Sequence, residues 1–338
     1  MKPQEIITAQ HLAIGYRQGT KQETVVHRKL GFSLCRGELT CLLGPNGAGK
    51  STLLRTLTGS QPPLDGSLLL EGKPLTAYSK PELARRLAIV LTDKTTAGGL
   101  RVSELVSLGR QPYTGFFGRL TRHDRTIAEE SMRLAGIGHK ADAYMAELSD
   151  GERQKAMIAK ALAQQAPLIL LDEPTAFLDA VSRIEVMSLL HRLARNEHKT
   201  ILLSTHDIQQ ALQLADRLWL LSPANGLKSG ATEDLVLAGE MQRFFDRDGI
   251  VFDRQRNYFR LRESDRIPVW VETEDETLFF WAENALNRNG FSAVREKSNG
   301  STGIRIESPQ NITIFGRNGM KSLHTSFESM IRTLCGTK

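Results

Sequence analysis

The stretch Gly44-Pro-Asn-Gly-Ala-Gly-Lys-Ser-Thr52 decides the fold of this chain. It matches the pattern G-x-x-x-x-G-K-[ST], in which glycines let the backbone turn so that its N–H groups face phosphate oxygens. The apolar residues 40–43 enter this loop, and residues 53–57 leave it with a helical pattern. A strand before the loop and a helix after it are the context in which this pattern binds a nucleoside triphosphate. The sequence therefore predicts a phosphate-binding loop.

Every residue of this loop is a candidate nucleotide contact. Lys50 is expected to reach the β- and γ-phosphates, and the Ser51 hydroxyl is expected to bind Mg²⁺. The predicted nucleotide-binding residues of the loop are Gly44, Pro45, Asn46, Gly47, Ala48, Gly49, Lys50, Ser51 and Thr52.

Two adjacent carboxylates follow a second apolar run. Residues 168–171 are apolar and lead into Asp172 and Glu173, which Pro174 follows. Asp172 is expected to hold Mg²⁺ through water. Glu173 is placed to accept a proton from the attacking water, a general-base role typically worth about 10²–10⁴-fold in rate. Together with the loop, this pair predicts nucleotide hydrolysis.

Short apolar runs alternate with helical patterns over the first two thirds of the chain. Strands are predicted at Ile6–Thr8, from Leu34 to Leu43 around a turn at Arg36-Gly37, and before Asp172, Ser204 and Ser222. Helices are predicted at Glu152–Gln164 and Ser182–Arg195. Runs of about four apolar residues bounded by polar ones are typical of buried strands in a parallel sheet. The alternation predicts an α/β fold with helices on both faces of a parallel-sheet core.

After about Gly239 the pattern changes to that of a small α+β module. It predicts a hairpin of Ile250–Asp253 and Tyr258–Leu261, a strand at Val269–Glu272, a helix at Glu276–Arg288, three short strands between Phe291 and Phe315, and a final helix from Lys321 to Leu334.

Composition limits the remaining possibilities. No window of this 338-residue chain approaches the roughly 18 consecutive apolar residues that a membrane span needs. The start MKPQEIITAQ lacks an apolar signal core, so a cytoplasmic location is expected. Residues 78–123 hold eight Lys or Arg against three Asp or Glu, most of the net charge of +6. This basic stretch is compatible with anionic lipid, a polar partner surface or a phosphate backbone.

The segment Leu148-Ser-Asp-Gly-Glu152 identifies a family. It lies twenty residues before Asp172 and resembles the signature of ABC-transporter ATPases, usually written LSGGQ. Ser149 and Gly151 precede a helical pattern, so they form a helix start with free N–H donors. The resemblance implies that this segment faces the γ-phosphate held by the opposite subunit of a homodimer, with ATP at the interface.

Three further residues match the same family and extend the resemblance to about residues 3–240. Tyr16 resembles the aromatic residue that stacks on adenine, and Ala176-Phe-Leu-Asp179 resembles the loop that crosses the dimer interface in this family. His206, after the strand at 201–203, resembles the switch histidine. The resemblance implies that His206 contacts the γ-phosphate and holds water beside Glu173.

Within this family, Leu105-Val-Ser-Leu-Gly-Arg-Gln-Pro-Tyr113 and Phe117-Gly-Arg-Leu120 look most like the ATPases of iron-chelate, haem and cobalamin importers. The resemblance implies a polytopic membrane permease as partner, an extracytoplasmic substrate-binding protein in the same system, and a peripheral position at the cytoplasmic face of the membrane. Because the matching segment faces the permease in such importers, we expect the basic stretch from Lys80 to Arg122 to do the same, and expect no nucleic acid as a partner.

One position departs from the importer pattern. These ATPases usually place a Gln after the strand that here reads 87–91, where it senses Mg²⁺ and the γ-phosphate; this chain has Thr92, followed by Asp93. Threonine is shorter by about two bonds, so its contact to the metal would be missing or bridged by water. The alternative is that Asp93 reaches the metal itself.

The sequence thus predicts a nucleotide-binding domain over residues 1–240, with a helical subdomain at about 85–165, and an α+β accessory module over 241–338. The predicted function is that of an ATP-hydrolysing subunit of an ABC importer. Two rivals remain: a soluble ABC ATPase that works on ribosomes or DNA, and a regulatory protein whose output is the C-terminal module.

Overall fold

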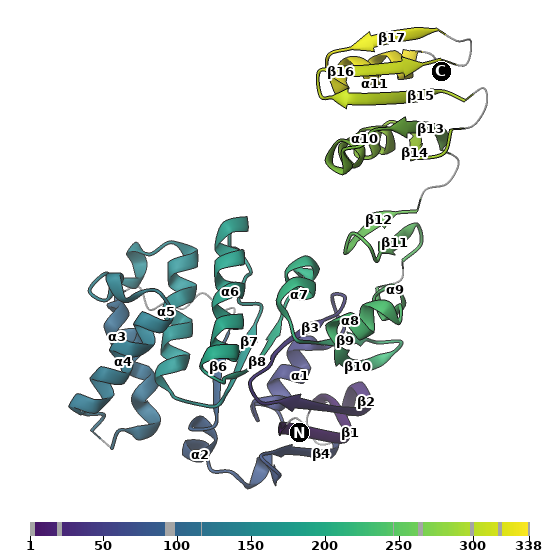
Figure 1. Ribbon diagram of the computed structural model, residues 1–338. Helices are drawn as coiled ribbons and strands as arrows, with labels where there is room; N and C mark the ends of the chain where they lie inside the picture. The colour runs from purple at the N-terminus through teal and green to yellow at the C-terminus, as the bar shows by residue number, and fades with distance from the viewer. Residues whose placement is uncertain are drawn as a thin grey trace. The chain divides into compact units, whose positions relative to one another are not determined.

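A six-stranded sheet, in the order β10-β9-β3-β8-β7-β6, carries the phosphate loop (Figure 1). The structure is a computed structural model that describes residues 4–18, 22–91, 99–115, 117–245, 247–262, 266–297, 301–316 and 320–336. The strands of this sheet are β3 (Leu39–Leu43), β6 (Leu87–Val90), β7 (Leu168–Asp172), β8 (Thr200–Ser204), β9 (Arg217–Ser222) and β10 (Gly226–Ala231). They run parallel except for β10, which is antiparallel to β9. Parallel strands end at one edge, where ligands of such sheets bind.

Alternate residues of the central strands enter two separate cores. On β7, Ile169 and Leu171 belong to a core shared with the helices α5 (Asp150–Ala163) and α6 (Ala180–Asn196). Leu168 and Leu170 belong to a second core on the other face, shared with α1 (Lys50–Leu57) and a second sheet. Because both faces are covered, these strands read as continuous apolar runs.

The second sheet is antiparallel, in the order β2-β1-β4-β5. Its strands are β1 (Glu5–Gln18), β2 (Gln22–Cys35), β4 (Asp65–Leu70) and β5 (Lys73–Pro74). The sequence indicated only Ile6–Thr8 as a strand at the start of the chain, which is far too short. Register shifts between Glu5 and Ile7 and between Ala9 and Leu12 interrupt the alternation of buried and exposed residues. These irregularities hide the two-residue period by which strands are predicted.

The helical subdomain lies beside β6 and α6, which α5 contacts (Figure 1). Its members are α3 (Val102–Ser107), η2 (Leu108–Tyr113), α4 (Arg122–Leu134), η3 (Gly138–Lys140), η4 (Met145–Glu147) and α5. The other helices are η1 (Leu75–Ala77), α2 (Lys80–Ala84), α7 (Ile208–Leu214), α8 (Thr232–Leu237) and α9 (Glu240–Phe244). The subdomain follows β6, so its start lies later than residue 85.

The chain divides into two compact units, residues 1–247 with 251–260 and residues 248–250 with 261–338. The hairpin β11 (Ile250–Asp253) and β12 (Tyr258–Leu261) has the predicted bounds. Most of it packs with the first unit, through Phe252 and Phe259, which contact each other and the main core. The sequence placed this hairpin beyond a boundary at 240, but the first unit extends past that position.

The second unit has its own sheet and core. The sheet order is β14-β13-β15-β16-β17, formed by β14 (Phe291–Val294), β13 (Ile267–Glu272), β15 (Gly303–Ser308), β16 (Asn311–Phe315) and β17 (Lys321–His324), with helices α10 (Glu276–Arg288) and α11 (Phe327–Gly336). The helix expected from Lys321 was wrong in its first turn, because residues 321–324 pair with β16 and α11 begins only at Phe327.

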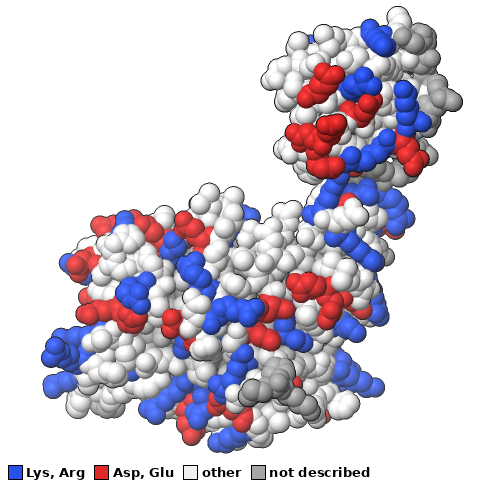
Figure 2. Space-filling model, in the orientation of Figure 1, with Lys and Arg blue, Asp and Glu red and all other residues white. Residues whose placement is uncertain are grey.

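The described residues contain no helix of the length and apolar character that a membrane span requires. On the face shown in Figure 2, Lys and Arg side chains are interspersed with Asp and Glu. Several cations of the basic stretch are also engaged within the chain: Arg86 pairs with Glu71, Arg101 pairs with Asp142, and Arg110 is buried. The predicted basic surface is therefore weaker than its charge count indicates.

Candidate functional site at the carboxyl edge of the central sheet

The phosphate loop joins the fully buried strand β3 to α1. Gly47 and Gly49 have φ angles of 78° and 91°, a left-handed conformation that favours glycine. At Gly49, a Cβ atom would also lie 2.5 Å from a methyl group of Val26. Glycine is therefore required there for two reasons. The loop and the start of α1 thus present backbone N–H groups at a helix N-terminus, the geometry that binds phosphate.

Lys50 lies over this loop. Its ammonium group donates to the carbonyl oxygen of Gly44 at 2.8 Å, and the side chain is buried. Burial lowers the pKa of Lys50, and the carboxylates of Glu173 and Asp172 oppose that effect. The acidic pair at the end of β7 is therefore close enough to act electrostatically on the loop lysine.

A serine on the next strand fixes the acidic pair. The Ser204 hydroxyl donates to Asp172 Oδ1 at 2.6 Å and accepts from the backbone N–H of Glu173 at 2.9 Å. Glu173 itself has a φ of 46°, which is uncommon for a side chain other than glycine. Ser204 was not among the residues predicted for the site. The feature that points to Ser204 is the pairing register of β7 and β8, which places Asp172 opposite Ser204.

The side chains of His206 and Glu173 contact each other directly. His206 Nε2 lies 2.6 Å from Glu173 Oε1, and about half of the His206 side chain is exposed. Both residues line a cleft of about 550 Å³. Its other walls include Thr175 and Arg183 on one side and Asn257 to Phe259 of the β11–β12 hairpin on another. A cleft with both polar and apolar walls therefore adjoins the carboxylate expected to activate water.

Ser51 and Asp172 share a second cleft of about 390 Å³. A hydroxyl and a carboxylate are hard oxygen donors, which Mg²⁺ prefers, so the donor set fits the metal that the sequence predicts. Leu91, at the end of β6, lines the same cleft. Thr92 and Asp93, the possible sensor residues, follow Leu91 but lie outside the described residues.

Two side chains from the antiparallel sheet contact the phosphate loop and the start of α1. The Tyr16 hydroxyl lies 2.6 Å from Thr52 Oγ1, so the predicted adenine-stacking residue is beside the first turn of α1. The buried His27 ring lies 2.7 Å, through Nε2, from the Ala48 carbonyl oxygen. His27 was not predicted, because a histidine within a long strand carries no sequence pattern that points to a loop.

Ser149, Gly151 and Asp179 form a second group, at the starts of α5 and α6. Ser149 caps α5 in a reciprocal pair with Glu152, and Asp179 caps α6 by accepting from the backbone of Ser182 at 2.9 Å. A Cβ atom on Gly151 would lie 2.9 Å from the Ser182 hydroxyl. The two helix starts are thus packed together.

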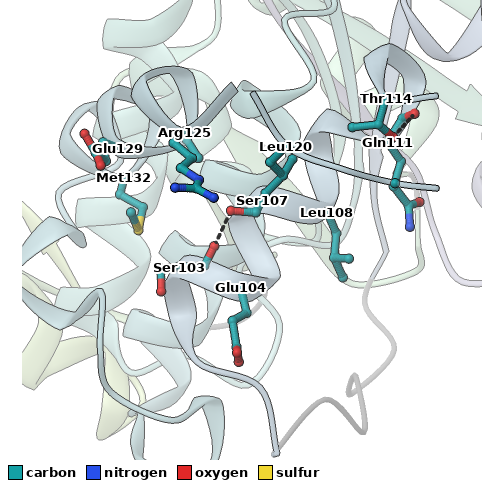
Figure 3. A pocket seen from close by; sticks show the side chains of 12 residues that line it. Ser103, Glu104, Ser107, Leu108, Gln111, Thr114, Leu120, Arg125, Glu129 and Met132 are labelled. Carbon is teal, nitrogen blue, oxygen red and sulfur yellow. Dashed lines mark hydrogen bonds between the residues drawn. The ribbon is translucent and has the colours of Figure 1, made fainter. Parts of the chain in front are cut away.

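A groove of about 480 Å³ lies in the helical subdomain, between α3 and η2 on one side and α4 on the other (Figure 3). Figure 3 shows the side chains of Ser107 and Arg125 pointing toward each other across it. Leu108, Gln111 and Glu129 are among the other lining residues. Part of the groove, including Ser107, Leu108 and Gln111, comes from the segments 105–113 and 117–120 that resemble importer ATPases.

A phosphate loop after one strand and two carboxylates at the end of another define the class of P-loop ATPases. Two family models match the chain, the ABC transporter model over residues 27–176 and the iron ABC transporter C-terminal domain model over residues 266–335. The chain belongs to the family of ABC-transporter ATP-binding proteins, and as such it binds and hydrolyses ATP.

Similar proteins support this placement. An ABC transporter ATP-binding protein of Methanocaldococcus jannaschii is 36% identical over 77% of this chain and 88% of its own length. The ferric enterobactin transport ATP-binding protein FepC of Escherichia coli is 35% identical over 73% and 89%. The iron(3+)-hydroxamate import ATP-binding protein FhuC of Bacillus subtilis is 34% identical over 74% and 92%.

Solved structures show the same fold. The ABC transporter cassette MJ0796, solved as a dimer, is similar with a TM-score of 0.58 and 25% identity, over 67% of this chain and 98% of that chain. A post-hydrolysis state of the same cassette holds ADP and Pi.

Proposed function

We propose that this chain is the ATPase subunit of an importer that moves an iron chelate through a separate membrane permease. The observation that carries this proposal is the C-terminal unit, whose residues 266–335 match the iron ABC transporter C-terminal domain model. The names of FepC and FhuC point to the same cargo. Haem and cobalamin are the other possible cargoes, because the segment 105–120 also resembles the ATPases of haem and cobalamin importers. The rival reading, a soluble ABC ATPase with a regulatory role, has no such support.

The phosphate loop binds the triphosphate of ATP in this proposal. Lys50 leaves the Gly44 carbonyl and pairs with the β- and γ-phosphates, since a buried ammonium gains more from phosphate than from a neutral carbonyl. Tyr16 stacks on adenine from its place beside α1. Ser51 and Asp172 hold Mg²⁺, which supplies charge neutralisation of the phosphates when bound.

Glu173 is the proposed general base and His206 its partner. A water molecule in the cleft beside Glu173 would lose its proton to the carboxylate as it attacks the γ-phosphate. Ser204 holds the acidic pair in place. The close approach of His206 to Glu173 supports a role for the histidine in orienting the base before the γ-phosphate arrives.

Two copies complete each other's sites in this proposal. Ser149 and Gly151 at the start of α5 bind the γ-phosphate held by the partner, because a capped helix N-terminus offers N–H donors and a favourable dipole. Asp179, at the start of α6, lies at the same dimer interface in this proposal. The dimeric relative and the packing of the two helix starts support this arrangement.

The groove of the helical subdomain is the proposed docking site for the permease. It is concave, and one of its walls includes residues of the segment that resembles the permease-facing part of importer ATPases. Docking there would hold the chain at the cytoplasmic face of the membrane as a peripheral subunit. An extracytoplasmic binding protein would deliver the chelate to the permease. Nucleic acid has no part in the proposal.

Reconstitution tests the cargo. The chain is combined in proteoliposomes with the polytopic permease and binding protein encoded beside its gene, and uptake of a ferric siderophore, haem and cobalamin is compared. We expect ATP-dependent uptake of the ferric siderophore alone. Uptake of haem or cobalamin instead would show that the proposed cargo is wrong. The absence of a neighbouring permease gene would favour the soluble ABC ATPase.

A further inference from the structure

Arg110 is buried, although it lies in the most basic stretch of the chain. Its side chain is 3% exposed, on η2. The guanidinium donates through Nε to Asp124 Oδ1 at 3.0 Å, and through one terminal nitrogen to the Ala163 carbonyl oxygen at 2.8 Å and to Gln165 Oε1 at 2.9 Å. The ring of Tyr113 lies 4.0 Å from the guanidinium carbon. One side chain therefore connects three elements: η2, the start of α4 and the end of α5.

The partner carboxylate is itself built into a helix start. Asp124 closes the capping box of α4, accepting from the hydroxyl of Thr121 at 2.6 Å and from its backbone N–H at 2.9 Å. These bonds, followed by Arg110, lower the pKa of Asp124 to about 2, so the pair stays ionised at neutral pH. Arg110 thus binds the first turn of α4 through Asp124. The residues Arg125 and Glu129, which line the groove, follow Asp124 on this helix.

The opposite wall of the groove, on η2, also contacts the end of α5. Leu108 and Gln111, the near neighbours of Arg110 on η2, line that wall. Gly109 lies so close to α5 that a Cβ atom there would be 2.2 Å from the Lys160 carbonyl oxygen. The hydroxyl of Tyr113 donates to the Gln164 carbonyl oxygen at 3.1 Å. Both walls of the groove are therefore fastened to the last turn of α5.

The other end of α5 is the signature start at Ser149. At 1.5 Å per residue, the 14 residues of this helix span about 21 Å as one rigid element. A displacement of its first turn is therefore carried to its last turn, where Arg110 binds. Replacing a buried ion pair with apolar residues is often neutral or stabilising, so stability alone gives no reason for burying this pair.

We propose that Arg110 is a positioning residue that couples the signature helix to the permease groove, so that the position of α5 sets the spacing of both groove walls. This proposal rests on the proposed function, because it assumes that ATP moves α5 and that the permease occupies the groove. The guanidinium suits the task, since its planar fork directs donors to separate acceptors in fixed directions, which a lysine ammonium does not.

Hydrogen exchange in the full-length chain tests the coupling without a permease. Exchange of residues 103–115 and 121–132 is compared with and without ATP and Mg²⁺, in a Glu173→Gln background that keeps ATP bound. With Arg110 present, we expect ATP to change exchange rates in both segments by at least about threefold. In the double variant Arg110→Met, Asp124→Asn, which leaves no lone buried charge, that change should fall by more than half while ATP affinity stays the same.

Two further variants separate coupling from simple packing. Gln165 has a φ of 54°, so Gln165→Gly suits the backbone, removes one contact of Arg110, and should reduce the ATP-induced change without loss of folding. Arg101→Met, which removes an exposed arginine of the same subdomain, should leave the change intact. A full ATP-induced change in the double variant and in Gln165→Gly, or none with Arg110 present, would overturn the proposal.

The reconstituted importer separates this proposal from the proposed function. If the permease stimulates ATP hydrolysis by the unaltered chain, we expect the double variant to lose most of that stimulation and keep its unstimulated rate. Equal stimulation of both would reject the coupling role and leave the function standing. Failure of the unaltered chain to bind or respond to the permease would instead count against the proposed function itself.

Discussion

At the scale of single residues, the contact between His206 and Glu173 gives the sharpest expectation. Glu173→Gln keeps the shape of the side chain but removes its capacity to take a proton. We expect ATP to bind with near-normal affinity and hydrolysis to slow by at least about 10²-fold. The variant should also dimerise in the presence of ATP, because the sandwich cannot reopen through hydrolysis. Steady-state phosphate release and size-exclusion chromatography with ATP measure these outcomes.

The matched control is Glu185→Gln on α6, which removes an exposed carboxylate paired with Lys155. Its hydrolysis rate should stay within about twofold of normal, since an exposed ion pair contributes little. Near-normal hydrolysis by the Glu173 variant, measured with the permease present, would remove Glu173 from the role of base.

Lys50→Ala should act on binding rather than on the chemical step. The buried ammonium lies over the phosphate loop, and its removal deletes a charge-assisted contact worth roughly 1.5–3 kcal/mol, or at least about tenfold in affinity. Titration with a fluorescent ATP analogue measures the loss, and Lys228→Ala, at an exposed lysine on β10, is the control. Unchanged affinity in the Lys50 variant would show that the γ-phosphate binds elsewhere.

The residues that could be predicted from the sequence are those whose spacing is fixed by backbone geometry. The phosphate loop must follow a strand and precede a helix, and Glu173 and His206 each follow a buried strand, so the motif places them at one sheet edge. Ser204 and His27 were beyond this reasoning. Their contacts depend on the pairing of β7 with β8 and of β1 with β2, which sequence spacing does not specify.

At the scale of elements, the start of α5 offers a matched pair of caps. Ser149 caps α5 and Ser79 caps the short helix α2, each in a reciprocal pair with a glutamate three residues on. Either change to alanine should cost about 1 kcal/mol of stability. Only Ser149→Ala should also slow ATP hydrolysis, because only α5 is proposed to face the partner's γ-phosphate.

Thermal unfolding and steady-state hydrolysis at saturating ATP distinguish the two effects. Equal loss of hydrolysis in both variants would show that the cap matters through stability alone. An unaltered rate in Ser149→Ala would count against the sandwich dimer, in which this hydroxyl lies at the phosphate.

The bounds of helices and strands could be predicted where the local sequence pattern alone decides the conformation. Helix α10 and both strands of the β11–β12 hairpin have the predicted bounds, because strong local signals enclose them. Strand β1 was underestimated because bulges disrupt its alternation. The sequence prediction extended the final helix back to Lys321, whereas pairing with β16 decides the conformation of residues 321–324.

At the scale of the whole molecule, the division into two units explains why the boundary near residue 240 was early. The change of sequence pattern after about Gly239 predicts a domain boundary there, but packing of the first unit continues beyond it. Phe259 contacts Phe245 and Phe252, with ring centroids 5.6 and 4.9 Å apart, and these rings join the main core of the first unit. A boundary set by aromatic contacts between distant residues is invisible to local composition.

This packing leads to a test with two truncations. A chain that ends at Arg262 keeps the hairpin and every residue proposed to bind ATP, so it should bind ATP as the full chain does. A chain that ends at Phe245 loses Phe252 and Phe259, which are half-buried. Because a fully buried aromatic residue contributes about 1.5–3 kcal/mol and these two are half-buried, removing both should cost roughly 1.5–3 kcal/mol of stability. Denaturant unfolding and ATP titration of both truncations give the measurement.

Equal stability of the two truncations would show that the hairpin does not stabilise the first unit. Loss of ATP binding by the chain that ends at Arg262 would show that the C-terminal unit is part of the nucleotide-binding fold.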